Sequence, residues 1–386
     1  MSEIGLPDPG VEVESIPPEE IEKTVETGRV TVLDVRVEQD FEEWRIDVEA
    51  SQTINVPYYE LLDGIDGDLI ERLSASDRVV VVCPRGNSSR YITALLSAEG
   101  IEARNLSDGM NGWANLYEHE TLDIDTETTV LQYQRPSSGC LAYLVVSDGE
   151  AGVIDPLAAF VDRYVRDADA MDAEIRYAID THIHADHVSG VRGLAAETGA
   201  EIVLSEPVVS RGVDFEVDRA VTNGERLPLG ESTIEVVHTP GHTTGMTAYR
   251  VEGVLFSGDT LFTESVARPD LQGGAEDVDT AAETLWNTLN DRIRALPDET
   301  VIAPAHFGER ALPGADGTYT APIGELETSV ALLDASREAF VEAILEDMPP
   351  RPANYEEIIK LNRGRREASD EEAFSLELGP NNCSAG

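Results

Sequence analysis

Histidine is scarce in this chain, so the positions of its few histidines are informative. Only seven of the 386 residues are His, and three of them lie in the hexapeptide His182-Ile183-His184-Ala185-Asp186-His187, directly after the apolar stretch EIRYAID. Residues two apart point the same way in an extended loop, so His182 and His184 can reach one metal ion, while Asp186 and His187 can reach a neighbouring position. A polar helix cap would need only one such side chain. The hexapeptide therefore predicts a metal site.

Three further segments carry residues of ligand type, and each directly follows an apolar, strand-like stretch. They are His242 in PGHT, Asp259 in SGDT and His306 in PAH. Loops that follow strands carry functional residues disproportionately often, and several of them at one sheet edge can surround a single centre. His119 and His238 lack this context, and we interpret them as a surface and a packed histidine.

A second kind of chemistry is indicated by Cys83, which ends the apolar stretch RVVVVC and is followed by PRGNSSR and a helical pattern. A loop between a strand and a helix can aim several backbone N–H groups at one anion. Those donors, with Arg85 and Arg90 nearby, would favour the thiolate of Cys83. The alternative is a small buried core residue. The Gly-Asn-Ser-Ser loop favours the reactive thiol.

The charge of the chain is extreme. It has 28 Lys and Arg against 75 Asp and Glu, for a net charge of -47, and the acidic residues are spread along its whole length. Such self-repulsion destabilises a compact state at ordinary ionic strength but is largely screened at molar salt. We interpret the composition as adaptation to high internal salt, with an acidic surface for a basic partner as the alternative. Nucleic acid is disfavoured as a ligand.

Location and redox state follow from simple absences in the sequence. No apolar run approaches the roughly 18 residues of a membrane span, and MSEIGLPDPG lacks the basic and apolar stretches of a secretory signal. We therefore expect a cytoplasmic protein that does not enter a membrane. Three cysteines cannot make a disulfide framework. Cys140 is expected to be a buried thiol and Cys383 an exposed one.

The alternation of apolar patterns predicts two domains and an α/β fold. Strand-like VTVLDV and RVVVVC alternate with helical segments up to about residue 117, which predicts a parallel sheet covered by helices over residues 15–120. The acidic residues 121–126 are the expected linker. From residue 127 strands and helices alternate to about residue 306, and a helical tail begins at about residue 325, with apolar residues at helical spacing through IGELETSVALLDASREAFVEAIL, so the second domain is expected over 127–386.

The first domain resembles the rhodanese sulfurtransferases. The resemblance is carried by Cys83 with GNSSR, by Leu33-Asp34-Val35-Arg36 and by the closing stretch 106–113, LSDGMNGW. It implies a rhodanese-like parallel-sheet domain in which Cys83, assisted by Arg90, carries a persulfide. One segment departs from the pattern, since Trp44-Arg45-Ile46 stands where many members have Gly-His-Ile.

The second domain resembles the metallo-β-lactamase superfamily, through HxHxDH followed by PGHT, GD and PAH. The resemblance implies an αβ/βα sandwich and two metal positions that share Asp259. The first position would use His182, His184, His242 and Asp259, and the second Asp186, His187, His306 and Asp259. With two zinc ions this set would serve a thioester hydrolase such as hydroxyacylglutathione hydrolase, also called glyoxalase II.

The stretch after Asp259 is similar to the Arg-x-Asp-x-x-x-Gly segment of the persulfide dioxygenase branch, with Arg268, Asp270 and Gly274 in the matching positions. That resemblance implies one Fe(II) per chain, held by a 2-His-1-carboxylate face of His182, His242 and Asp259. The remaining ligand-type residues would then orient these three; they are His184, Asp186, His187 and His306. The same residues serve both metal states, so the motifs alone do not choose between them.

The fusion favours sulfur chemistry. A thiol that handles sulfane sulfur shares an intermediate with a persulfide dioxygenase but none with a thioester hydrolase. We therefore expect iron-dependent oxidation of a low-molecular-weight thiol persulfide by O2 to sulfite and thiol, coupled to sulfur transfer on Cys83. The alternatives are a two-zinc thioester hydrolase with a rhodanese module and a non-catalytic sulfur carrier. Homo-oligomerisation is left open.

Three arginines are candidates for binding the anionic substrate. Arg268 lies in the segment after Asp259, and Arg365 and Arg366 lie in the tail sequence LNRGRREA. A guanidinium can hold a substrate carboxylate by paired hydrogen bonds. For Arg365 and Arg366 the sequence favours the alternative, a solvated helix end.

Overall fold

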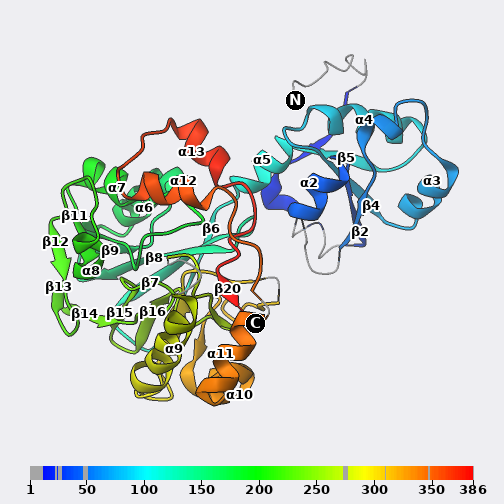
Figure 1. Ribbon diagram of the computed structural model, residues 1–386. Coiled ribbons are helices and arrows are strands. Elements are labelled where there is room, and N and C mark those ends of the chain that lie inside the picture. The colour runs from blue at the N-terminus through cyan, green and yellow to red at the C-terminus, as the bar shows by residue number, and fades with distance from the viewer. Residues whose placement is uncertain are drawn as a thin grey trace. The chain divides into compact units, whose positions relative to one another are not determined.

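The computed structural model describes residues 12–21, 24, 28–46, 51–272, 277–308, 310–346 and 348–385 (Figure 1). The chain divides into two compact units. The first ends at Leu116 and also includes Arg135–Ser137, whereas the second comprises Tyr117–Gln134 and the chain from Ser138 onward. We predicted that the first domain runs to residue 120, but β6 (Glu118–Thr121) pairs with β7 (Thr129–Arg135). Residues 117–121 therefore lie with the second unit.

The first unit is built on a five-stranded sheet in which all neighbouring strands are parallel. In spatial order the strands are β1 (Ser15–Ile16), β5 (Ala103–Leu106), β4 (Arg78–Val82), β2 (Val30–Asp34) and β3 (Gln52–Asn55). The helices are α2 (Glu38–Glu43), α3 (Gly67–Ser74), α4 (Asn87–Ala98) and α5 (Gly109–Ala114), with short 3-10 turns at Pro18–Glu20 and Tyr58–Glu60.

The apolar run in β4 is continuous because both faces of this sheet are covered. Successive side chains of a strand point to opposite faces. Val79 and Val81 accordingly pack with Ile92 of α4, whereas Val80 packs with Trp113 of α5. The strand therefore ends with Cys83 at the start of the loop that leads into α4.

The second unit is a sandwich of two mixed sheets. The first sheet has the order β12 (Arg219–Val221), β11 (Glu201–Ser205), β10 (Glu174–Ile179), β9 (Glu150–Ile154), β8 (Cys140–Ser147), β7 and β6. The second has the order β13 (Arg226–Leu229), β14 (Ser232–His238), β15 (Thr247–Val251), β16 (Val254–Gly258), β18 (Val301–Pro304) and β19 (Ala321–Pro322). A separate pair joins β17 (Val266–Ala267) to β20 (Ser384–Ala385).

Three apolar clusters show four layers in this unit. Between the sheets, Tyr143 and Ile179 of the first sheet pack with Val236 and Phe256 of the second. The outer face of the first sheet is covered by α6 (Val161–Ala170), α7 (Val191–Thr198) and α8 (Glu206–Ser210). The outer face of the second sheet is covered by α9 (Val278–Thr288), its π-helical continuation Leu289–Ile293, α10 (Ile323–Ser329) and α11 (Arg337–Glu346) (Figure 1).

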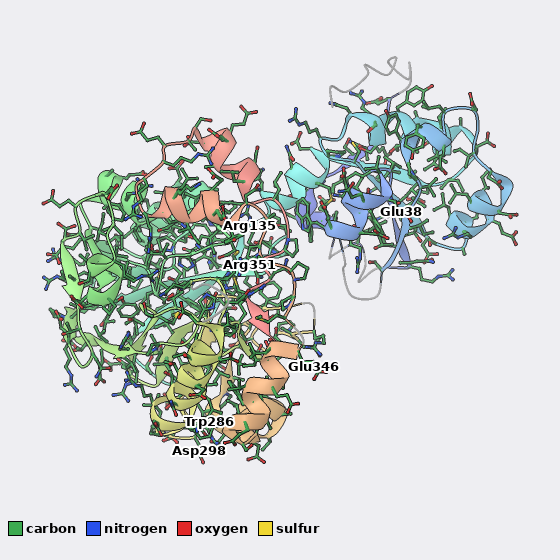
Figure 2. The ribbon with its side chains drawn as sticks, in the orientation of Figure 1. Glu38, Arg135, Trp286, Asp298, Glu346 and Arg351 are labelled. Carbon is green, nitrogen blue, oxygen red and sulfur yellow. The ribbon has the colours of Figure 1, made fainter. Side chains whose placement is uncertain are left out.

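The observed architecture confirms the predicted fold class, a parallel-sheet α/β domain followed by an αβ/βα sandwich with a helical extension. The extension also contains α12 (Tyr355–Asn362) and α13 (Asp370–Leu376). Its first part is broken by a 3-10 turn at Ala331–Asp334, because Val330 and Ala335 have extended backbone. The indole of Trp286, labelled in Figure 2, donates to the carbonyl of Ala335 at 3.1 Å and holds this break against α9. Of the described helices, none is both long and apolar enough to cross a membrane.

We predict that the stability of this fold depends steeply on salt. A net charge of -47 repels itself over a Debye length of about 10 Å at 0.1 M salt but only about 3 Å at 1 M. The unfolding temperature should rise by on the order of 10 °C between 0.2 M and 2 M KCl, a shift equivalent to a few kcal/mol for a domain of this size. Sucrose, which stabilises without screening charge, is the control. Equal stabilisation by sucrose and KCl would contradict the charge argument.

Candidate metal centre

The predicted ligands lie on loops that leave neighbouring strands at one edge of the sandwich. The histidine hexapeptide follows β10, His242 follows β14, Asp259 follows β16 and His306 follows β18. Gly258 turns the chain into Asp259 with a φ of +52°, and a Cβ there would lie 2.2 Å from Met246 Cε and 2.6 Å from Thr181 Oγ1. Only glycine fits this close turn, which brings the Asp259 carboxylate to the histidines.

His182, His242 and Asp259 form a buried cluster of three donor atoms. Asp259 Oδ2 lies 3.6 Å from His182 Nε2 and 3.5 Å from His242 Nε2, which are longer separations than ordinary hydrogen bonds. Such spacing suits atoms that share one ion at about 2.1 Å from each. Asp259 Oδ2 and His182 Nε2 are buried and have no hydrogen-bond partner among the described residues. The donor set therefore fits a metal ion.

Asp155, which the sequence analysis did not single out, orients two of the histidines. Its Oδ1 accepts from Thr181 N at 2.7 Å and from His184 Nε2 at 3.0 Å, and its Oδ2 accepts from the Thr181 hydroxyl at 3.0 Å. The same hydroxyl oxygen accepts from His182 Nδ1 at 2.9 Å. The free ring nitrogen is therefore Nε2 in His182 and Nδ1 in His184. Both atoms are buried without a partner in the described chain.

The third histidine is oriented by backbone. His242 Nδ1 donates to the carbonyl of Arg268 at 2.7 Å, which leaves Nε2 as the free nitrogen. Burial lowers the pKa of His242, and burial followed by the neighbouring His184 lowers the pKa of His182. Burial alone would raise the pKa of Asp259, but His306 and the other two histidines bring it below its usual value. Neutral imidazoles and an ionised carboxylate are the forms that bind a cation.

The other predicted ligands make a second cluster with a different character. Asp186 Oδ2 accepts from His306 Nε2 at 2.8 Å, from His187 Nδ1 at 3.0 Å and from the Cys140 thiol at 3.2 Å. His306 Nδ1 also donates to Asp259 Oδ1 at 2.6 Å. These side chains largely satisfy one another, although Asp186 Oδ1 and His187 Nε2 have no partner within the described ranges. His119 and His238 belong to neither cluster.

Two cysteines lie at this second cluster. Cys140 is buried, as predicted, and its sulfur accepts from the Ser138 hydroxyl at 3.0 Å. The prediction that Cys383 is exposed is wrong, because this residue is only 1% exposed and its sulfur lies in one group with Asp259 and His306. The reason is tertiary: β20 pairs with β17 and carries the end of the chain into the centre.

Arg268 holds that terminal segment in place. Its Nη1 donates to the carbonyls of Pro350 and Asn382 at 2.7 and 2.8 Å, and its Nε and Nη2 donate to Asp270. Arg351, labelled in Figure 2, donates to the same carboxylate from the tail. With 1% exposure and these partners, Arg268 supports the centre, and the contacts favour a structural role over the predicted substrate contact. Gly274, the last residue of the matching segment, lies outside the described residues.

The two tail arginines that we predicted to bind substrate have acidic partners. Arg365 lies 3.8 Å from Asp214, and Arg366 lies 2.9 Å from Glu357 and 2.5 Å from Glu372. These pairs also favour structural roles.

In the first unit, Cys83 is fully buried and forms part of the apolar core. Its carbonyl accepts from Met110 N at 2.8 Å, and Gly109 has to be glycine because a Cβ there would lie 2.0 Å from that carbonyl oxygen. The stretch 106–113 therefore closes directly on the Cys83 loop.

The nearest polar partner of the thiol is Ser89 on α4, whose hydroxyl lies 3.1 Å from Cys83 Sγ and 2.6 Å from Asn105 Oδ1. Arg85 and Arg90, the predicted neighbours, are exposed at the surface. The hydrogen-bond partner of the Cys83 thiol is thus a serine of the GNSSR stretch. The sequence analysis did not single it out.

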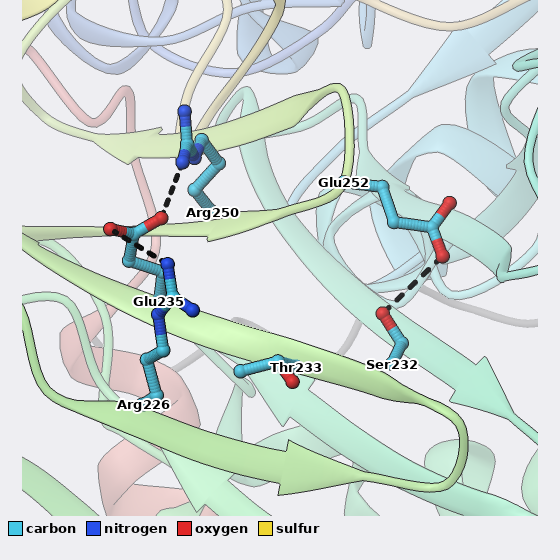
Figure 3. A pocket seen from close by; sticks show the side chains of 6 residues that line it. All are labelled: Arg226, Ser232, Thr233, Glu235, Arg250 and Glu252. Carbon is cyan, nitrogen blue, oxygen red and sulfur yellow. Dashed lines mark hydrogen bonds and ion pairs between the residues drawn. The ribbon is translucent and has the colours of Figure 1, made fainter.

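Hollows on the described part of the second unit include one over the second sheet and one beside His242. One, lined by residues of β13, β14 and β15, has charges that pair with one another, since Glu235 contacts both Arg226 and Arg250 while Ser232 donates to Glu252 (Figure 3). The other, of about 130 Å³, is lined by His242 and therefore opens on the candidate metal centre.

Comparison with known proteins agrees with this geometry. Residues 136–306 match the family model of the metallo-beta-lactamase superfamily, and residues 17–116 match that of the rhodanese-like domain. The bovine protein named persulfide dioxygenase ETHE1, mitochondrial is 27% identical over 60% of this chain and 86% of its own length. The hydroxyacylglutathione hydrolase of Rhodospirillum rubrum is 34% identical over 41% of this chain and 57% of its own length. The crystal structure of ETHE1 from Myxococcus xanthus superposes with a TM-score of 0.52 at 28% identity, over 64% of this chain and 98% of that one.

The chain therefore carries a rhodanese-like domain followed by a domain of the metallo-beta-lactamase superfamily, as the motifs predicted. It is a metallo-β-lactamase-fold metalloenzyme related to persulfide dioxygenase and to hydroxyacylglutathione hydrolase.

We predict that Asp155→Asn weakens metal binding by roughly 10- to 100-fold, as is usual when a residue that orients a metal-ligating histidine is replaced. An amide cannot accept from Thr181 and His184 with both of its polar atoms, so one histidine loses its orientation. Chelator competition measures the affinity. Asp167→Asn, which removes a carboxylate bonded to Tyr133 and Arg163, is the control. Unchanged affinity in Asp155→Asn would exclude this role for Asp155.

Proposed function

We propose that the chain oxidises a low-molecular-weight thiol persulfide at a single iron held by His182, His242 and Asp259. The overall reaction is RSSH + O2 + H2O giving RSH, sulfite and two protons. The outer sulfur leaves its partner sulfur and is oxidised, and O2 accepts the four electrons. The -47 charge further supports work at high internal salt.

The observation that carries this proposal is the difference between the two clusters. Around Asp259 Oδ2, the donor atoms face one another without hydrogen bonds, as ligands of an ion do. At the neighbouring position, Asp186 Oδ2 already accepts from three donors. The arrangement supports one metal position rather than two. The similarity to persulfide dioxygenases over 86% of the length of the bovine relative agrees with it.

When bound, a ferrous ion would supply open coordination positions for a sulfur atom and for O2, because two histidines and one carboxylate occupy only one face of it. The protein groups around it do the rest. Asp155, through the Thr181 hydroxyl, and the Arg268 carbonyl leave Nε2 of His182 and Nε2 of His242 free for the ion. His306, held between Asp186 and Asp259, keeps the Asp259 carboxylate oriented.

The first domain suits the same chemistry. We propose that Cys83 accepts a sulfane sulfur as a persulfide and passes it to a nucleophile, of which sulfite, the product of the second domain, is one. The Ser89 hydroxyl, 3.1 Å from Cys83 Sγ, stabilises the thiolate form when its single proton is donated to the sulfur and not to Asn105 Oδ1 at 2.6 Å.

A second function, hydrolysis of a thioester by two zinc ions, is favoured by one observation. Asp186 Oδ1 and His187 Nε2 are buried and have no partner among the described residues, and they lie in the group that would hold a second ion. The 34% identity to the Rhodospirillum rubrum hydrolase agrees with that reading, although it spans only 57% of that protein.

Metal content and O2 uptake separate the two functions. Protein purified anaerobically at high salt should hold about one iron and consume O2 with a thiol persulfide. His182→Ala should lose both metal and O2 uptake, because it removes one of three ligands. His119→Ala, a histidine outside both clusters, is the matched control. About two zinc ions per chain with thioester hydrolysis and no O2 uptake would establish the alternative.

The sulfur-transfer proposal has its own test. Cys83→Ser should abolish transfer from thiosulfate to cyanide, because a hydroxyl cannot carry the sulfane sulfur. Ser89→Ala should reduce the rate roughly tenfold, the lower range for a hydrogen bond to a charged group. Ser97→Ala, an exposed serine of the same helix, is the control. Transfer that survives in Cys83→Ser would show that another group carries the sulfur.

A further inference from the structure

The loop that carries the histidine hexapeptide is buried between β10 and α7. Residues 180–190 all lie within the described ranges and contain no helix or strand, only an isolated bridge between Ser189 and Leu157. His184, His187, Val188 and Ser189 are at most 7% exposed. Backbone N–H and C=O groups that are buried away from water need hydrogen-bond partners. This loop therefore depends on partners from outside itself.

One side of the loop is held by the segment that follows β9. The amide of Ala158 donates to the carbonyl of Val188 at 2.8 Å, and the amide of Gly190 donates to the carbonyl of Pro156 at 2.6 Å. Other polar groups of the loop backbone have their partners elsewhere.

The other side of the loop is held by Asn362, the last residue of α12. Its Nδ2 donates to the carbonyl of His184 at 2.9 Å and to that of His187 at 2.8 Å, while its Oδ1 accepts from Ser189 N at 2.8 Å. An asparagine amide has two donor hydrogens and one acceptor oxygen, so every polar atom of the side chain is used. Asn362 is 4% exposed. It therefore gives this loop three of the backbone hydrogen bonds that a strand or helix would otherwise provide.

Asn362 reaches the loop because the helical tail is anchored there at further points. Arg192 of α7, the helix that follows the loop, donates to the carbonyl of Leu361 at 2.9 Å, and α12 lies beside α7 (Figure 1). Glu377, which directly follows α13, accepts from Val188 N at 2.7 Å through Oε1. The tail thus contacts the loop from positions 173 and 189 residues away in the sequence.

We propose that Asn362 is a positioning residue for the metal centre, and that it couples metal binding to docking of the C-terminal tail. The rings of His184 and His187 belong to the same residues whose carbonyls Asn362 holds. A shift of this backbone would therefore move both rings away from Asp155 and Asp186, their carboxylate partners. The proposal rests on the candidate metal centre and applies to one iron ion or to two zinc ions, so it does not depend on which reaction follows.

Coupling of this kind is reciprocal. If the docked tail raises the affinity for a metal ion by some factor, the bound ion stabilises the docked tail by the same factor. The competing explanation is that Asn362 only stabilises the fold. That role predicts a lower unfolding temperature on substitution, with no change in metal affinity or ligand geometry well below that temperature.

The test titrates the full chain, stripped of metal by a chelator at high salt, with Co(II), whose visible absorption reports the geometry of its ligands. Asn362→Asp keeps the shape and the acceptor but loses both donors. It should lower the Co(II) affinity roughly tenfold, the lower end for residues that orient metal ligands, and change the spectrum. Asn362→Ala, which introduces no charge, should do the same. Asn354→Asp is the matched control, because it removes an exposed amide that donates to the carbonyl of Leu376.

Hydrogen exchange gives a second readout that needs no variant. Co(II) should slow the exchange of the α12 amides in the wild-type protein and in Asn354→Asp, and should slow it less in Asn362→Asp. Unchanged exchange in the wild-type protein would overturn the coupling.

The outcomes also separate this proposal from the proposed function. Equal Co(II) affinity and equal spectra in all variants would overturn the positioning role and leave the metal centre intact. Wild-type protein that binds no Co(II) would overturn the metal centre and the positioning role together. The expected Co(II) differences without O2 uptake by the iron-loaded wild-type protein would support the positioning role and overturn the proposed oxidation.

Discussion

The carboxylate of Asp155 is the constraint on which the metal centre depends. It is 1% exposed, has a φ of 53°, and accepts hydrogen bonds from Thr181 N, the Thr181 hydroxyl and His184 Nε2. A buried charge is costly without such donors, and a non-glycine residue in the left-handed region adds about 1–3 kcal/mol. These hydrogen bonds orient the rings of His182 and His184. Because the Thr181 hydroxyl donates to Asp155, the Thr181 oxygen can only accept a hydrogen bond from His182 Nδ1. Asp155 therefore determines indirectly that Nε2 is the free nitrogen of His182.

This constraint explains why the two clusters differ. Asp155 orients His184 directly and His182 through Thr181, and His182 Nε2 is thereby left free to face Asp259 Oδ2. Asp186 has no comparable support, and its own oxygen becomes the acceptor for His306, His187 and Cys140. The same types of side chain therefore leave donor atoms without partners in one cluster, while in the other cluster most of them are hydrogen-bonded to one another. The HxHxDH motif alone does not distinguish these outcomes.

The sequence predicted what depends on local pattern and missed what depends on tertiary pairing. The β4 run and the loops after β10, β14, β16 and β18 are local, so the fold class and the ligand-type residues could be predicted. Cys383 was expected to be exposed because it is near the chain end, but its burial depends on β20 pairing with β17 and on Arg268 reaching Asn382, 114 residues away. Asp155 directly follows β9 and is one of 75 acidic residues, so nothing in the sequence marked it.

Acidic composition hides carboxylates but makes arginines informative. The chain has 28 basic and 75 acidic residues, so an arginine without an acidic partner is unexpected. Arg268 and Arg351 share Asp270, and Arg365 and Arg366 have acidic partners, which accounts for these four as supports of the tail. Two guanidinium groups left without a carboxylate in the described chain meet at the hollow that includes a metal ligand. Arg211 is exposed, so water can solvate its guanidinium, whereas Arg363 Nε is buried and has no hydrogen-bond partner among the described residues.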